Sequence, residues 1–357
     1  MIIYMYLFKR FSLGLIVSLI VLVSLEIFFS FTAEIKYLNI GNYNIYTLSK
    51  YIVLNIPKSI SIMFPYAVLI GSMLSLGAMA SDMEFVSMQA AGISTTKIMT
   101  IIIVQAFILS TLFYYISDSI VPTFSNEAEK NKNLALNKKV IFHKNGVWFK
   151  DNNTYIKINE IYSDKNLRDI TMYKYDEKST LSSIKTIVEA RYIDKVWKLT
   201  KTEETILTSI PITKKYFAEE ETIEFIDRKL INIKTHKATS LSLSDVVKNI
   251  TYLDQNNLDA TTQKKIYWDK IFKPFSTIIM LFLSMPFIFG RQRSSNLSQR
   301  IVLGVFIGIA FFIISSILPN LGMVLGIAPI ISVLLPNLLF IIAGKYLLDY
   351  QLQASLR

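Results

Sequence analysis

The most informative stretch of the chain is Ile56–Ser94, with the sequence IPKSISIMFPYAVLIGSMLSLGAMASDMEFVSMQAAGIS. It begins with an apolar run, Ser59–Ala80, and about 20 residues rising 1.5 Å each are enough to cross the hydrocarbon of a bilayer. Small residues gather late in this run, where they would allow a neighbouring helix to approach closely. They are Gly71, Ser72, Gly77, Ala78 and Ala80. The stretch therefore predicts a membrane-spanning helix with a close helix neighbour.

A short amphipathic helix over residues 81–91 is predicted directly after this span. Ser81 and Glu84 have the spacing of a capping box, and Gly92 is typical of the residue that follows a helix end. Apolar residues three and four apart share one face, and acidic residues flank it, which suits docking to a partner. The residues expected on this docking helix are Ser81, Asp82, Glu84, Phe85, Met88 and Gln89. The alternative is a loop helix packed on its own bundle.

The composition of the 357-residue chain indicates a membrane protein rather than one soluble domain. Hydrophobic residues make up 52% of the chain and the mean hydropathy is +0.40, but the middle of the chain is polar. The net charge of +11 lies largely beside apolar runs, where it indicates topology or contact with anionic lipid rather than with nucleic acid. The absence of cysteine excludes disulfides and thiolate chemistry.

Six membrane helices are expected from the apolar runs. Their predicted bounds are Phe11–Phe31, Ser59–Ala80, Ile98–Ile120, Pro274–Gly290, Ile301–Leu318 and Ile327–Leu348. The first is kept as a permanent helix because it is too long for the core of a signal peptide. Pro122 is expected to end the third helix, while Pro319 and Pro336 are expected to break or kink the last two.

Basic residues predict the orientation of these helices. Lys9 and Arg10, and a loop with Arg291, Arg293 and Arg300, are expected in the cytoplasm. The uncharged loop Asn320–Gly326 is expected outside. Both assignments agree with six spans, cytoplasmic termini and an extracytoplasmic middle domain.

From Thr123 to about Lys270 no run is long enough to cross a membrane, so a soluble domain is predicted there. VWFKDNNTYIKI, Val147–Ile158, predicts two alternating strands about the turn Asp151-Asn152-Asn153. Further strands are predicted at Thr171–Tyr175, Ala190–Ile193, Val196–Thr200 and Thr222–Ile226, and a helix at Ser242–Asn256 with Ser244 as its cap. Short strands at this spacing favour an antiparallel sandwich or jelly roll.

The predicted fold class is a polytopic α-helical membrane protein with six transmembrane helices and an inserted antiparallel β jelly-roll domain. Residues 1–122 would hold helices one to three with the 81–91 helix. Residues 123–258 would form the jelly-roll domain with a C-terminal helix, and residues 259–357 would hold helices four to six.

The sequence carries no motif of an active site. There is no G-x-x-x-x-G-K-[ST] loop for ATP phosphates and no G-x-S-x-G elbow. His143 and His236, the two histidines of the chain, lack zinc-ligand spacing and are expected at the surface. A membrane protein without its own catalytic, cofactor or metal site is therefore predicted.

Charged residues in the first two predicted helices could each lie in more than one environment. Lys36 and Lys58, at the outward ends of the first two helices, either extend their ammonium groups to the interface or contact an anionic lipid headgroup. Glu26 lies inside the first helix, where facing lipid at the bilayer centre would cost about 3 kcal/mol. It is therefore expected to face a partner helix, a wet cavity or the interface. Nearby aromatic residues are typical of an interfacial belt, namely Phe31, Tyr37, Phe64 and Tyr66.

The chain resembles, over essentially its whole length, the LptF/LptG family, the permease subunits of the lipopolysaccharide export ABC transporter. FPYAVLIGSMLSLGAMASDMEFVSMQAAGIS, Phe64–Ser94, is similar to the second helix and the coupling helix of that family. IYWDKIFKPFSTIIMLFLSMPFIFG, Ile266–Gly290, and GIAPIISVLLPNLLF, Gly326–Phe340, are more similar to the LptG branch than to the LptF branch. In the middle domain the resemblance rests on VWFKDNNTYIKI and the spacing of the strands.

This resemblance implies a transport subunit rather than an enzyme. Such a chain would pair with an LptF-type permease, and a dimer of an LptB-type ATPase would dock on the coupling helices and hydrolyse ATP. Lipopolysaccharide would leave the Gram-negative inner membrane and pass to a periplasmic bridge of LptC- and LptA-type proteins. The open alternatives are the LptF-type role and a membrane-anchored periplasmic sensor or structural protein.

The resemblance also implies roles for particular residues. Ser81–Ala91 would lie in a groove of the ATPase, with Glu84 prominent, and Lys36 would contact phosphates or sugars of the lipid. Better-known members carry a lysine and an aspartate where this chain has Ser30 and Ala33, so the headgroup contacts are expected to be rearranged. The lipid-binding candidates are Lys36, Lys58, Glu34 and Phe31.

Overall fold

The computed structural model describes residues 2–136, 146–163, 165–176, 178, 180–193, 196–208, 213–217, 221–223, 241–289 and 297–356. The chain forms two compact units. The membrane unit comprises Met1–Lys36, Ile52–Ser125 and Thr261–Arg357, and the β unit comprises Tyr37–Tyr51 and Asn126–Ala260.

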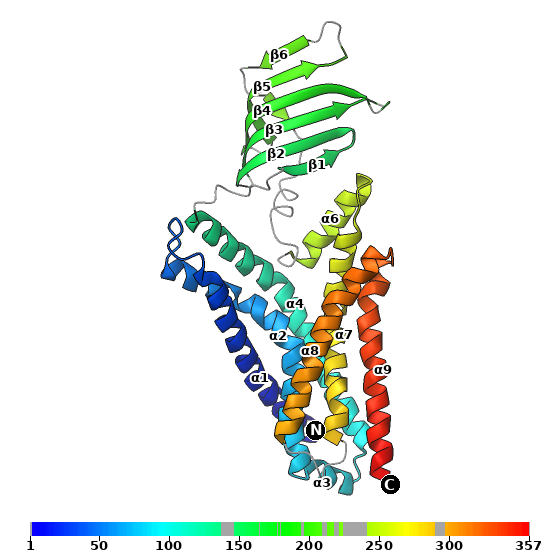
Figure 1. Ribbon diagram of the computed structural model, residues 1–357. Coiled ribbons are helices and arrows are strands. Elements are labelled where there is room, and N and C mark those ends of the chain that lie inside the picture. The colour runs from blue at the N-terminus through cyan, green and yellow to red at the C-terminus, as the bar shows by residue number, and fades with distance from the viewer. Residues whose placement is uncertain are drawn as a thin grey trace. The chain divides into compact units, whose positions relative to one another are not determined.

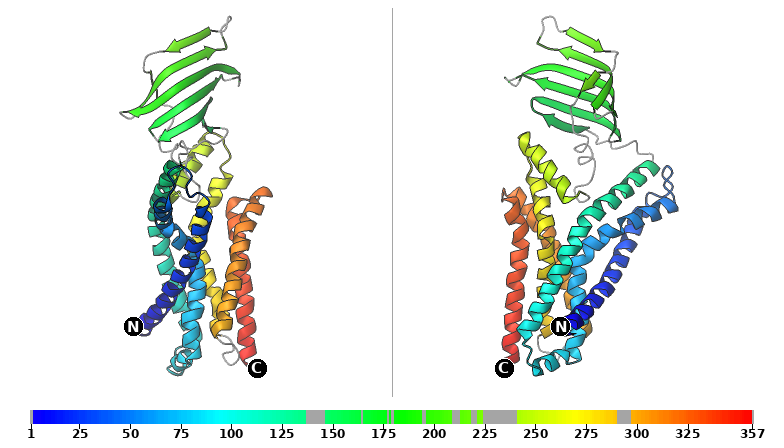
Figure 2. Two further views of the ribbon diagram at one scale, coloured as in Figure 1. Left: turned by 60° about the vertical axis from the view of Figure 1, so that its left-hand side comes forward. Right: turned by 180° about the vertical axis from the view of Figure 1, so that it is seen from behind.

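Among the described residues, six helices are long and apolar enough to span a membrane. They are α1 (Ile2–Ile35), α2 (Ile45–Ser81), α4 (Thr95–Ala135), α7 (Thr261–Phe289), α8 (Leu297–Val324) and α9 (Pro329–Leu356) (Figure 1). All six predicted spans coincide with one of these helices. The first three and the fifth lie wholly inside longer helices, whereas α9 begins two residues after the predicted start at Ile327, and the predicted end of the fourth span at Gly290 lies outside the described residues. Helices α8 and α9 are in contact and lie side by side in both views of Figure 2.

The expectation that Pro122 ends the third helix is wrong, because α4 continues through this proline to Ala135. Pro319 and Pro336 likewise lie inside α8 and α9. A proline removes one backbone donor, and a helix can continue where neighbouring groups satisfy the freed carbonyl. These prolines therefore do not mark the helix boundaries.

Glycine residues bring α1 and α2 into direct contact. A Cβ atom added to Gly71 would lie 2.7 Å from the carbonyl oxygen of Gly14, closer than real Cβ contacts come. The Ser18 hydroxyl donates a hydrogen bond to the Ala67 carbonyl at 2.8 Å across the same crossing. The close neighbour predicted from the small residues of α2 is thus confirmed, and it is α1.

The β unit contains one antiparallel sheet in which strands adjacent in sequence are adjacent in space (Figure 1). Its strands are β1 (Val147–Asp151), β2 (Thr154–Ser163), β3 (Asn166–Tyr175), β4 (Leu181–Ile193), β5 (Val196–Ile206) and β6 (Thr213–Phe217), with β7 (Glu221–Ile223) paired to β5. The predicted turn is confirmed, because Asp151 pairs with Thr154 and Asn152 has a φ of +48°. The last residues of the predicted strand Thr222–Ile226 lie outside the described residues.

One face of this sheet forms the hydrophobic core of the β unit. Burial alternates along the strands, as period-2 side-chain geometry requires. The fully or almost fully buried members include Phe149, Ile156, Ile158, Leu167, Ile170, Ile187, Trp197 and Leu199. The predicted fold class, a polytopic helical membrane protein with an inserted β domain, is therefore confirmed.

Helix α6 (Leu243–Gln255) follows the sheet, and the predicted cap at Ser244 is wrong. Ser242 is the N-cap: its backbone is extended, with φ −72° and ψ 161°, and its hydroxyl accepts a hydrogen bond from the Asp245 amide at 3.2 Å. Ser244 already lies in the first helical turn, where its backbone is helical and cannot take the extended cap conformation.

Candidate functional site

The predicted docking segment contains a short helix, α3 (Glu84–Ala90). Figures 1 and 2 place α3 at the end of the membrane unit where α1 starts and α9 ends. The Gly92 amide donates to the Gln89 carbonyl at 2.9 Å and the Ile93 amide to the Met88 carbonyl at 3.1 Å. Gly92 has a φ of +85°, so these bonds form a Schellman motif. The prediction that Gly92 ends this helix is confirmed.

The predicted capping box between Ser81 and Glu84 is wrong. Ser81 is the last residue of α2, and its hydroxyl donates to the Gly77 carbonyl at 3.1 Å. The residue before α3 is Met83, in a left-handed conformation with φ 59°, and its side chain makes no cap bond. Because α2 extends through Ser81, the backbone there is helical instead of extended. Glu84 therefore makes its contacts elsewhere.

Glu84 binds two side chains at the start of α1. The Tyr6 hydroxyl donates to Glu84 Oε2 at 2.8 Å, and Arg10 Nη2 donates to Glu84 Oε1 at 3.4 Å. Arg10 Nε also donates to the Tyr6 hydroxyl at 3.0 Å. Sequence reasoning treated Arg10 as a topology signal and missed Tyr6, although the two lie four residues apart and so share a helix face. The carboxylate thus connects α3 to α1.

The apolar face predicted for docking lies against the membrane unit itself. Phe85 is 1% exposed and packs on Phe289 of α7, with ring centroids 4.8 Å apart. Met88 is half-buried on the same core, whereas Gln89 is exposed and donates to the Thr95 hydroxyl at 2.8 Å. The alternative prediction, a loop helix that packs on its own helix bundle, therefore holds for this face of α3.

A different face of the same segment is exposed. Met83 and Val86 are about half exposed, at 53% and 47%, and the neighbouring Asp82 and Ser87 are also exposed. These four residues are called the outer face of the α3 segment below. They combine two apolar side chains with one negative charge.

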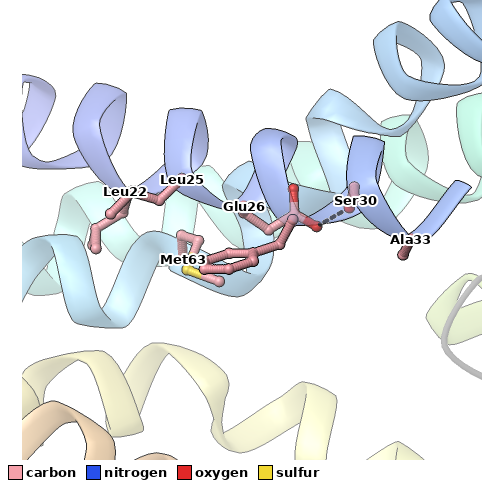
Figure 3. Close-up of a pocket in the computed structure, with 7 residues that line it drawn as sticks. Leu22, Leu25, Glu26, Ser30, Ala33 and Met63 are labelled. Carbon is pink, nitrogen blue, oxygen red and sulfur yellow. Dashed lines mark hydrogen bonds between the residues drawn. The ribbon is translucent and has the colours of Figure 1, made fainter. Parts of the chain in front are cut away.

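A cavity of about 480 Å³ opens on α1 (Figure 3). Residues spaced three and four apart on α1 form one stripe along it, and a residue of α2 closes one side. The lining residues are Leu22, Leu25, Glu26, Phe29, Ser30, Ala33 and Met63. The Ser30 hydroxyl donates to Glu26 Oε1 at 2.9 Å. Of the three environments expected for Glu26, the structure therefore supports the cavity.

The lipid-binding candidates predicted from sequence lie on or directly after α1 and on α2. Lys36 is exposed directly after α1, Glu34 and Phe31 are half-buried on α1, and Lys58 is half-buried on α2. The described lining of the cavity includes none of these four residues. It does include Ser30 and Ala33 of α1. The predictions for His143, His236 and the Arg291–Arg293 loop lie outside the described residues.

Six helices that can span a membrane, with a short connecting helix, a cavity on the first of them and an inserted β domain, describe a polytopic membrane protein. Residues 5–350 match the family described as lipopolysaccharide export system permease LptF/LptG. The chain belongs to this family, as the resemblance of its sequence indicated.

Two curated relatives are similar to the chain over almost their whole length. The lipopolysaccharide export system permease protein LptG of Haemophilus influenzae is 32% identical over 336 residues, which cover 93% of this chain and 94% of the relative. The protein of the same name from Escherichia coli K12 is 28% identical over 351 residues, 96% of each chain. Both relatives belong to the LptG branch that the sequence of this chain resembles.

Proposed function

We propose that this chain is the LptG-type permease subunit that extracts lipopolysaccharide from the inner membrane. The main support is the family match, which extends from residue 5 to residue 350 and so includes both the membrane unit and the β unit. Both relatives reported above are LptG proteins, which favours this role over that of the LptF-type sibling. The partner would be an LptF-type permease.

Energy would come from a separate LptB-type ATPase dimer, since the sequence has no phosphate-binding loop of its own. We assign docking to the outer face of the α3 segment, where Met83 and Val86 are exposed beside Asp82. Phe85 and Glu84 would support docking indirectly, because Phe85 contacts α7 and Glu84 contacts α1, and these contacts hold α3 in place. Gln89 is exposed at the end of α3 and would lie at the margin of this contact.

The cavity on α1 would take an acyl chain of the lipid rather than its phosphates. Its lining is apolar apart from Glu26 and Ser30, and a carboxylate repels an anionic headgroup. Each CH₂ group that the cavity shields from water contributes roughly 0.8 kcal/mol. Lys36 lies three residues beyond Ala33 and would meet the headgroup, with Lys58 as a second cation.

The proposed orientation has both termini in the cytoplasm and the β unit in the periplasm. Lys9 and Arg10 lie at the start of α1, and a basic start of a first span favours a cytoplasmic location. The β unit would then pass lipid to a bridge of LptC- and LptA-type proteins.

Purification of the tagged chain from native membranes in mild detergent tests this function. We expect a second six-span chain, an ATPase with a phosphate-binding loop and bound lipopolysaccharide to accompany it. If the chain arrives alone from membranes in which such an ATPase is abundant, the permease function is wrong.

A further inference from the structure

Glu26 places a carboxylate in the otherwise apolar cavity on α1. The Ser30 hydroxyl donates to Glu26 Oε1 at 2.9 Å, whereas Glu26 Oε2 accepts no hydrogen bond from any described residue. Within the described ranges no ion pair joins Glu26 to a lysine or an arginine. A charged group inside a membrane-spanning helix is costly, and it is typical of a functional site when its partner is not part of the helix bundle. The second oxygen of Glu26 is therefore available to a ligand.

The surroundings of Glu26 restrict what this ligand can be. The other residues of the lining, apart from Ser30, are apolar. Figure 3 shows Glu26 between Leu25 and Ser30 on the stripe of α1, with the hydrogen bond from Ser30 dashed. Hydrocarbon can fill the apolar part of the cavity, but only a hydrogen-bond donor can satisfy Oε2. We therefore expect a ligand that carries a donor directly beside its hydrocarbon.

The depth of Glu26 indicates which part of a lipid it meets. Glu26 lies ten residues before Lys36, which is about 15 Å along a helix. A headgroup at Lys36 would thus leave the region where the acyl chains begin on the side of Glu26. In lipopolysaccharide this region holds the amide N–H groups that join acyl chains to sugars and the hydroxyl groups of 3-hydroxyacyl chains. Both are neutral donors, whereas phosphate is an acceptor that a carboxylate repels.

We propose that Glu26 is a specificity-determining residue, whose Oε2 accepts a hydrogen bond from an acyl-linkage amide or hydroxyl of the lipid. Phospholipids whose chains are joined only through esters lack both donors, so Glu26 would distinguish lipopolysaccharide from them. Ser30 holds Oε1 and thereby orients the carboxylate, which leaves Oε2 to the lipid. The inference rests on the proposed function of the cavity and names the lipid group that the cavity recognises.

The test is photo-crosslinking from a benzophenone at Leu25, which lines the cavity, in the full chain purified with its partners in mild detergent. Three synthetic glucosamine phosphate lipids with equal chain lengths are the probes. The complete lipid has 3-hydroxyacyl chains and one amide linkage, the second lacks the chain hydroxyls, and the third has an ester in place of the amide. The unaltered chain should capture the complete lipid about tenfold better than one of the two analogues, since a hydrogen bond to a charged group is lost. The analogue that binds less well identifies the donor.

Three variants separate the carboxylate from the rest of the cavity. Glu26→Leu keeps the bulk and removes both oxygens, so it should capture all three lipids without the tenfold preference. Glu26→Gln keeps an acceptor oxygen and should retain part of the preference. The matched control is Ser24→Leu, which places the same apolar side chain on an exposed part of α1 outside the lining and should keep the full preference.

Each contrary outcome has its own meaning. Equal capture of the three lipids by the unaltered chain, or an unchanged preference in Glu26→Leu, would overturn the role of Glu26 and leave the cavity as an acyl-chain site. An equal loss of preference in Ser24→Leu would also overturn it. Capture of no lipid at Leu25 would contradict the proposed use of the cavity itself, and this inference with it. Loss of the second permease chain from Glu26→Leu would assign Glu26 to a contact between subunits instead.

Discussion

Tyr6 and Glu84 join the first membrane helix to α3 by a hydrogen bond of 2.8 Å between the Tyr6 hydroxyl and Glu84 Oε2. Seventy-eight residues separate the two in sequence. The helix that begins beside Tyr6 also carries the stripe that lines the cavity near Glu26. The residues that hold α3 and the residues that line the cavity therefore belong to one continuous helix, α1.

Exchanging the charges of Arg10 and Glu84 tests whether the contact of α1 with Glu84 acts within the chain. Arg10→Glu should lower the amount of ATPase that co-purifies severalfold, because it replaces the attraction between Arg10 and Glu84 with repulsion between two carboxylates. Glu84→Arg should do the same, and the double variant should recover most of the loss. The measurement is the ratio of ATPase to permease after affinity purification.

Lys9→Glu is the matched control, because it makes the same charge change at the exposed residue next to Arg10. It should leave the ratio unchanged. If Glu84 contacts the ATPase directly, Arg10→Glu will be harmless and the double variant will be no better than Glu84→Arg.

The crossing of α1 and α2 depends on the absence of side chains at Gly14 and Gly71. Gly14→Val would force the helices apart, because an added carbon would overlap the Gly71 carbonyl and the Ser75 side chain. We expect a loss of stability of about 3 kcal/mol or more, comparable with severe overpacking, read as a lower melting temperature in detergent. Gly308→Ala is the control: its added carbon would lie 3.6 Å from Leu69, an ordinary contact, so equal losses would contradict the explanation.

The spans and strands were predictable because they depend on properties that lie along the sequence. A bilayer demands a minimum apolar length, which α2 and α8 satisfy, and a half-buried sheet demands alternation, which Val147–Ile158 follows. Gly92 was predictable for a similar reason, because its left-handed φ favours glycine locally.

The site was harder to predict because it depends on which helix faces meet. Ser81 has the sequence of a cap, but α2 continues through it, and only packing decides where that helix ends. Phe85 has the pattern of a docking residue, but Phe289, about two hundred positions away, covers it. The cavity beside Glu26 follows from the crossing of α1 with α2, which no local pattern reports.

An ion pair between α4 and α7 should stabilise the membrane unit. Lys270 Nζ lies 2.7 Å from Asp118 Oδ1, and the two side chains are 20% and 30% exposed. Asp118→Asn should therefore lower the free energy of unfolding by about 1–3 kcal/mol, the range for hydrogen bonds to charged groups. The check is thermal unfolding in detergent. Glu203→Gln, which breaks the more exposed ion pair between Glu203 and Lys214, should have a smaller effect. Equal effects would argue against partial burial as the cause.

The stability of the β unit should fall in acid partly through Glu189. Arg191 Nε and Nη2 donate to the two oxygens of Glu189 at 3.0 and 3.1 Å. These bonds lower the pKa of Glu189 below its usual value of 4.5. The contribution is therefore complete above the unfolded-state pKa and is lost as pH falls through the lower folded-state pKa.

Hydrogen exchange of β4 amides between pH 3 and 6 measures this loss. Glu189→Gln should make the protection of β4 less dependent on pH, and Arg191→Gln should have a similar effect because it removes the donor. A pH dependence that is the same in both variants and in the unaltered chain would exclude Glu189 as a source.

Filling the cavity on α1 should separate lipid binding from assembly. Ala33→Trp places an indole in a space of about 480 Å³ without changing any charge. Each CH₂ group of an acyl chain that it displaces weakens binding by roughly 0.8 kcal/mol, about fourfold in affinity. We expect less lipopolysaccharide to be photo-crosslinked from a probe at Leu25, while the ATPase co-purifies as before because α3 is untouched. Ile20→Trp adds the same group on an exposed part of α1 outside the cavity lining, and it should crosslink normally. Normal crosslinking in Ala33→Trp would show that the lipid binds elsewhere, whereas equal losses in both variants would point to a general effect of bulk on α1.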